Sequence, residues 1–200
     1  MRADGTLSAP ACIRPAHQDF EIVMGQLGVG RCTLTSMTTL ERHAFNLGRL
    51  LANFQALEFM LRLFLNQLPN ARPIGILDGT DIYSLTVGSK VSESDITSYD
   101  SLGVLIDKYN AWAQANGHPQ IDRSLVDVRD ALAHGRVSAA SPNDKLRLIK
   151  FSKPKNGMVT VMFNQRLSEE WFSSERRRLN NAMHVLQASQ NTTPAYTRTR

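Results

Sequence analysis

The sequence has little cysteine and no long apolar run. Its 200 residues include two cysteines, Cys12 and Cys32, which are too few for a disulfide scaffold and lack metal-ligand spacing. No apolar stretch approaches the roughly 18 residues that a membrane-spanning helix needs, and the first residues contain no apolar signal core. These absences predict a cytoplasmic protein with reduced thiols and no membrane partner.

Positive charge is concentrated in the second half of the chain. The formal net charge is +5; residues 1–100 hold eight Lys and Arg against ten Asp and Glu, whereas residues 101–200 hold fifteen against eight. A basic surface favours a polyanionic partner, because lysine and arginine that neutralise phosphates release counterions. Ordinary scatter of charge, together with an arginine-tipped tail, is the alternative explanation.

Helical periodicity predicts a mainly α domain at residues 37–190, an antiparallel bundle of about four helices. The first helix is expected to begin at Thr38 or Thr39 and to end before Pro69. Because two apolar stripes overlap along this helix, we expect it to pack on two neighbours. The stripes are Leu47, Leu51, Phe54, Leu61, Leu65 and Leu68, and Leu50, Phe54, Leu57, Leu61, Phe64 and Leu68.

Capping residues set the expected limits of the other three helices. Asp95 is expected to cap a second helix that ends at Gly117. Ser124 begins a segment that resembles a capping box for the third helix, and Gly135 is expected to close that helix in the left-handed conformation. Ser168 is expected to cap the last helix.

The regions outside these helices are expected to be mostly irregular, with one hairpin. Apolar and polar residues alternate on both sides of Lys155-Asn156-Gly157, which predicts a β-hairpin at about residues 146–163, inserted before the last helix. Residues 1–36 are expected to form an irregular arm with one short strand at 20–24, and residues 191–200 a flexible tail.

The segment VRDALAHGRV, at residues 128–137, places an arginine, an aspartate and a histidine within six positions. Arg129 and His134 would lie about 140° apart on a regular helix, so they could flank a groove without sharing a face. Asp130 would share the face of His134 and could orient its imidazole. The simpler interpretation is that Arg129 and Asp130 are solvated and that His134 assists the helix end.

This segment resembles the signature of the HEPN superfamily (higher eukaryote and prokaryote nucleotide-binding). That signature is an arginine, a polar residue and then a histidine, with four to six residues between the arginine and the histidine. Arg129, Asp130 and His134 match it position by position, with four intervening residues, and LAHG is similar to the ending in bacterial members. The resemblance covers roughly residues 38–190 and implies a helical bundle that carries the motif on a late helix.

The resemblance implies a metal-independent endoribonuclease that needs no cofactor and forms a composite site across a homodimer. Histidine can act as a general acid or base when the RNA 2′-hydroxyl attacks phosphorus, and a guanidinium can stabilise the developing charge. Arg129 and His134 are therefore candidate catalytic residues, Asp130 a supporting residue, and Arg136 a candidate RNA-binding residue. The family also suggests a toxin or phage-defence effector, with a cognate inhibitor or regulator as a further partner.

Glu58 interrupts an apolar seam of the first helix, where an unpaired carboxylate would be costly. It either pairs with Arg62, four residues further on, or supports the site by orienting Arg129 or His134. The three arginines at 176–178 are expected to form a solvated helix face, because consecutive residues cannot share one side.

Two alternative functions use the same residues differently. A non-catalytic HEPN module would dimerise or bind a partner or a nucleotide, with the polar motif kept as an interface element. A regulatory nucleic-acid-binding protein would use the basic half of the chain alone. The complete motif favours catalysis, whereas a His134 buried within its own monomer would count against it.

Overall fold

A computed structural model describes residues 38–68, 71, 84–91, 93–139 and 145–192. The expected N-terminal arm, its short strand, both cysteines and the end of the tail lie outside these residues. Contacts divide the chain into two units, Met1–Thr38 and Thr39–Arg200, and the helices and strands described below belong to the second unit. No helix in the described ranges combines the length and apolar character needed to cross a membrane.

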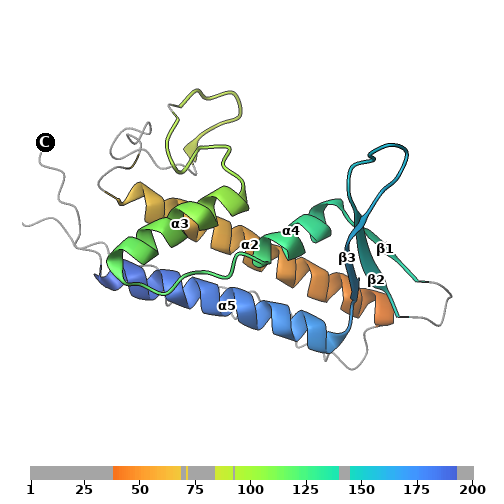
Figure 1. Cartoon of the computed structure of the whole chain (residues 1–200). Helices are drawn as coiled ribbons and strands as arrows, with labels where there is room; N and C mark the ends of the chain where they lie inside the picture. The colour runs from red at the N-terminus through yellow and green to blue at the C-terminus, as the bar shows by residue number, and fades with distance from the viewer. Residues whose placement is uncertain (1–37, 69–70, 72–83, 92, 140–144, 193–200) are drawn as a thin grey trace, which may run out of the picture. The chain divides into compact units, whose positions relative to one another are not determined.

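Helices and a small antiparallel sheet build the second unit (Figure 1). This confirms the predicted mainly α class and the hairpin before the last helix, whereas the short strand β1 was not among the predicted elements. The elements are α2 (Thr39–Asn66), α3 (Leu102–Asn116), α4 (Leu125–His134), β1 (Arg136–Ser138), β2 (Arg147–Phe151), β3 (Val161–Arg166) and α5 (Glu169–Thr192), with the strands in the order β1-β2-β3.

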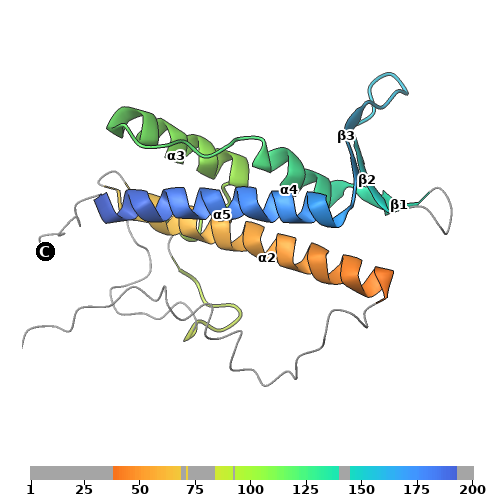
Figure 2. The ribbon, with the colours of Figure 1, turned by 90° about the horizontal axis from the view of Figure 1, so that it is seen from below.

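The helices depart from the expected antiparallel arrangement. The ring of His43 lies 5.7 Å from that of Phe172, and Asn46 donates hydrogen bonds to Glu169. The beginnings of α2 and α5 therefore lie together, and the two helices run in the same direction (Figures 1 and 2). Short loops favour antiparallel neighbours, but the connection after α2 is long, and residues 98–100 before α3 contact Arg62 in the last part of α2.

Arg62 determines where α3 begins. Its guanidinium donates to the carbonyl of Ser98 at 2.7 Å and to the carbonyl of Asp100 at 2.8 Å. These bonds hold the preceding residues outside the helix, and Ser101 then caps α3 through its side chain. The expected start at Asp95 is therefore wrong, because Arg62 bonds carbonyl groups that would accept helical hydrogen bonds if the helix were longer.

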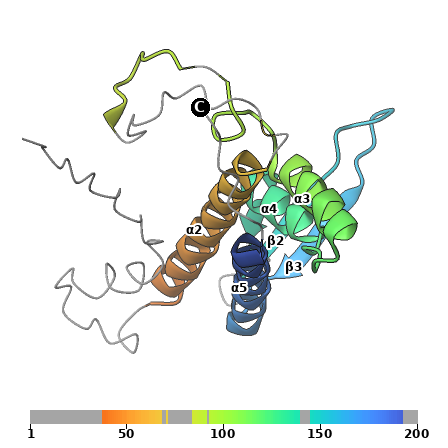
Figure 3. The same cartoon turned by 90° about the vertical axis from the view of Figure 1, so that its left-hand side faces the viewer.

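One of the two predicted stripes on α2 is buried in the core along most of its length, and the other stripe contributes Leu65 to the same core. Viewed along the bundle, α2, α5 and the α3–α4 segment surround this core (Figure 3). Leu51, from the other stripe, is 47% exposed and points away from it. The fully or nearly fully buried side chains on α2 are Leu50, Phe54, Leu57, Leu61 and Phe64.

The sheet packs against α4 through one face. Leu148 of β2 is only 1% exposed and belongs to the core. Beyond the strands, Lys155 pairs with Met158 across a turn in which Asn156 and Gly157 have φ of 53° and 75°. Two positive φ values match the predicted Asn-Gly hairpin turn.

Gly135 joins α4 directly to β1. Its φ of −79° and ψ of 177° are extended, so the expected left-handed closure of the helix is wrong. A Cβ at this position would lie 2.4 Å from the carbonyl oxygen of Ala131 and 2.7 Å from Cδ1 of Leu148. Glycine is required here because the carbonyl group of Ala131 and the side chain of Leu148 lie close to this position, not because of the sign of φ.

Candidate active site

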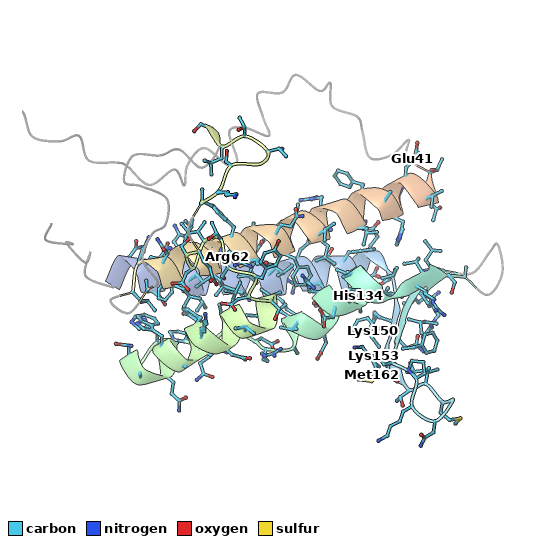
Figure 4. The ribbon with its side chains drawn as sticks, turned by 90° about the horizontal axis from the view of Figure 1, so that it is seen from above. Glu41, Arg62, His134, Lys150, Lys153 and Met162 are labelled. Carbon is cyan, nitrogen blue, oxygen red and sulfur yellow. The ribbon has the colours of Figure 1, made fainter. Side chains whose placement is uncertain are left out.

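The motif residues lie on the last turns of α4. His134 is exposed at the final residue of the helix, and Arg129 and Asp130 are partly exposed. Figure 4 shows His134 where α4 meets the sheet, with Lys150 nearby, whereas Arg62 lies further along the bundle. His134 is therefore not buried within its own chain and is exposed to solvent.

Arg129 and His134 line two different hollows. Arg129 lines a hollow of about 490 Å³ together with Leu51, Glu58 and Phe59 of α2. His134 lines a separate hollow of about 280 Å³ at the edge of the sheet. Their separation follows from the five-residue step along a helix, and a single chain does not bring the two side chains into one cleft.

Asp130 links α4 to the sheet. Its Oδ1 lies 3.2 Å from Nη1 of Arg129, and its Oδ2 lies 3.6 Å from Nζ of Lys150 on β2. Within the described residues, no hydrogen bond joins Asp130 to His134. The carboxylate is therefore placed to position Arg129 and the neighbouring strand, while the expected support of the imidazole stays a prediction.

Glu58 forms the ion pair that was one of its two expected interpretations. Its Oε1 accepts a hydrogen bond from Nη2 of Arg62 at 2.9 Å. In the part of the chain that the structure describes, no hydrogen bond connects Glu58 to Arg129 or His134. Glu58 and Arg62 both line the hollow that contains Arg129, so that wall carries their ion pair.

Arg178 holds the first turn of α4 in place. Its guanidinium donates to Asp122 at 2.7 Å, to Glu175 at 2.6 Å and also to the hydroxyl of Ser124. The hydrogen bond from Arg178 is the main cause that lowers the pKa of Asp122, whereas burial raises the pKa of Glu175.

Two sequence-based expectations fail at this end of α4. Ser124 makes no side-chain capping bond, because its hydroxyl bonds Arg178 and Asp122 instead. Arg178 and Arg176 are engaged with side chains of other segments, so the solvated face expected for 176–178 is wrong for these two, and only Arg177 is exposed.

A third hollow, of about 560 Å³, lies between the beginnings of α2 and α5. At its wall, buried Asn46 donates to both carboxylate oxygens of Glu169 and accepts from Arg176 at 2.9 Å. Burial lowers the pKa of His43 beside it. The sequence signal for this network was a polar residue four positions before Leu50, in line with the buried stripe. Because these polar side chains bond to one another, the network is a structural link between α2 and α5.

Comparisons with known proteins give no independent information about the motif. No protein-family model, no curated protein and no solved structure matches the chain. Among the described residues, no group of three or more His, Cys, Asp or Glu side chains is arranged to hold a metal ion. The resemblance to the HEPN signature therefore rests on residues 129–134 and on their place at the end of a helix.

Proposed function

We propose that this chain is a metal-independent endoribonuclease of the HEPN type, in which His134 and Arg129 act on an RNA phosphodiester at a homodimer interface. The observation that carries the proposal is the exposure of the complete motif at the end of α4, with a hollow on each side of it. A motif kept for packing alone would bury its histidine, and His134 is exposed.

The residue types match the chemistry of transesterification. His134 takes the proton from the 2′-hydroxyl, whose oxygen then forms a bond to phosphorus as the bond from phosphorus to the 5′-oxygen breaks. The leaving 5′-oxygen takes a proton from water, so each site needs one histidine and one arginine. Arg129 donates to the non-bridging oxygens and stabilises the charge that builds on them. The products are a 2′,3′-cyclic phosphate and a 5′-hydroxyl.

A second copy explains why the two side chains diverge within one chain. Beside Arg129, Leu51 and Phe59 are 47% and 36% exposed. Adjacent exposed apolar side chains are typical of an interaction surface. A copy that covers them around a twofold axis would bring its own α4 next to Arg129, and the histidine and arginine of different chains could then meet in one cleft.

The test is cleavage of total RNA in the presence of EDTA by the wild type and two variants. His134→Ala and Arg129→Ala should each lower the cleavage rate by at least about a hundredfold, the usual contribution of a general acid or base or of a charge-stabilising donor. The controls are His184→Ala and Arg177→Ala, which remove an exposed histidine and an exposed arginine from α5 and should leave the rate unchanged.

Wild-type protein that leaves both structured and single-stranded RNA intact would refute catalysis. If that protein still forms dimers or binds RNA, the non-catalytic HEPN module replaces the nuclease as the function of the motif. Circular dichroism should show that the variants keep their helices, because both substituted side chains are at least partly exposed.

A further inference from the structure

The sheet turns its second face to solvent, and this face carries three arginines. The register pairs Arg136 with Ile149, and Arg147 with both Ser138 and Arg166. Directly paired residues share a face, and faces alternate along a strand. Because Leu148 points into the core, its neighbours on β2 point outward, and so do all three arginines.

These arginines are exposed and keep their charge available. Arg147 donates to the amide oxygen of Asn164 at 3.0 and 2.9 Å, which orients the guanidinium without neutralising it. The guanidinium of Arg136 lies 5.6 Å from the ring centre of Phe151. None of the three forms an ion pair within the described residues. The pKa of Glu170 is lowered mainly by the Ser168 hydroxyl and only weakly by Arg166.

The three charges lie close together. One comes from each strand, and Arg136 is displaced by two residues from the row that holds Arg147 and Arg166. Two residues span about 7 Å along a strand, and two strand spacings span about 10 Å. A patch of this size that holds three positive charges is complementary to consecutive phosphates of one nucleic-acid strand.

The arginine face continues into the hollow beside His134. Arg136 and Phe151 belong to both surfaces, and Pro154 and Val159 add apolar walls to the hollow. Phe151 is 38% exposed. Aromatic side chains and arginine planes next to basic residues bind unstacked bases of single strands, which a duplex hides.

We infer that this sheet face binds single-stranded RNA, with its phosphates on Arg136, Arg147 and Arg166 and a base in the hollow beside Phe151. This inference rests on the proposed function, since it names the substrate class and the path by which RNA reaches His134. It assigns binding roles to Arg147, Arg166 and Phe151, none of which belongs to the HEPN signature.

Binding is measured by fluorescence anisotropy with a short labelled oligouridine and the full chain carrying His134→Ala, so that no cleavage interferes. Replacing the three sheet arginines by glutamine should raise Kd at least about tenfold and reduce the slope of log K against log salt by about 2, at about 0.7 per phosphate of a single strand. The matching lysine triple should keep most of the slope, because lysine still neutralises phosphate.

The charge-matched control replaces Lys90, Arg123 and Arg177 by glutamine, which removes the same charge from exposed positions outside the sheet. It should change Kd by less than about threefold, the residual effect of net charge alone. Phe151→Leu should weaken binding about tenfold with an unchanged salt slope, because stacking involves no counterion release.

The outcomes of these experiments test RNA binding by the sheet separately from RNA cleavage by the motif. The inference would be overturned if the sheet triple and the control triple lose RNA affinity equally, or if duplex RNA binds as tightly as single strands. Binding of anionic phospholipid vesicles without binding of RNA would also overturn it. If the wild type cleaves RNA but the glutamine triple binds and cleaves normally, the sheet assignment fails and the proposed nuclease stands. If the wild type cuts nothing but binding depends on the three arginines, the sheet assignment stands and the nuclease fails.

Discussion

Replacing Gly135 by alanine should destabilise the fold, although the backbone there is extended and suits any residue. The added Cβ would lie 2.4 Å from the carbonyl oxygen of Ala131, 2.7 Å from Leu148 and 3.1 Å from the carbonyl oxygen of Ile149. Two of these atoms belong to backbone that is fixed by helix and strand hydrogen bonds. Overpacking of this kind costs about 1–3 kcal/mol, and we expect the upper end, about 3 kcal/mol, because the backbone cannot rotate away.

The same substitution at Gly48 is the matched control. Gly48 is exposed within α2, and no atom lies within 4 Å of the position that its Cβ would take. Alanine there should stabilise the protein by about 0.5–1 kcal/mol, since it restricts the unfolded chain and favours the helix. One chemical change is thus expected to act with opposite signs at two positions.

Urea denaturation and thermal melting would measure both effects. For a chain of this length each kcal/mol shifts Tm by about 2–4 °C, so Gly135→Ala should melt about 6–12 °C below the wild type and Gly48→Ala slightly above it. A Gly135→Ala variant within about 0.5 kcal/mol of the wild type, the usual range for a neutral surface change, would refute the argument that close approach determines this residue.

Two further predictions concern the composite site and the beginning of α4. Mixing inactive Arg129→Ala and His134→Ala proteins should restore about a quarter of the wild-type cleavage rate, because half of the dimers are mixed and each mixed dimer has one intact site of two; no recovery after subunit exchange would contradict a site shared in this way. Asp122 has a folded-state pKa below its unfolded value, so its stabilising contribution is complete above the unfolded pKa and is lost as pH falls through the folded one. Asp122→Asn should therefore lower stability near neutral pH and flatten its decline below about pH 4, as urea denaturation over that range would show; an unchanged decline would mean that the pair with Arg178 contributes little.

Local signals in the sequence predict the elements that depend on local interactions. The apolar stripe of α2 predicts a long helix. The Asn-Gly pair predicts the hairpin turn, and Ser168 predicts the start of α5, where its hydroxyl accepts the amide of Trp171. Each of these features depends on residues a few positions apart, so the pattern contains nearly all of the information that fixes the local structure.

The rest depends on contacts between distant residues. Arg62 shifts the start of α3, and Arg178 replaces the expected cap at Ser124. Gly135 is constrained by Leu148 and Ile149, thirteen and fourteen positions further along the chain, as well as by the nearby carbonyl group of Ala131. The spacing of the motif predicts that Arg129 and His134 diverge, but the residues that complete each hollow follow only from how α4 packs against α2 and the sheet.

The shortness of α4 has a consequence for the motif it carries. Its ten residues are fewer than the roughly 12–15 that an isolated helix needs to be stable in water. The hydrogen bond from Arg178 to Asp122 stabilises the beginning of α4, and the close packing around Gly135 stabilises its end. A peptide of this segment, or a graft of it onto another protein, would therefore lose the geometry together with those two anchors. Substitution of Arg178 or Leu148 should therefore displace Arg129 and His134, although neither substituted residue belongs to the signature.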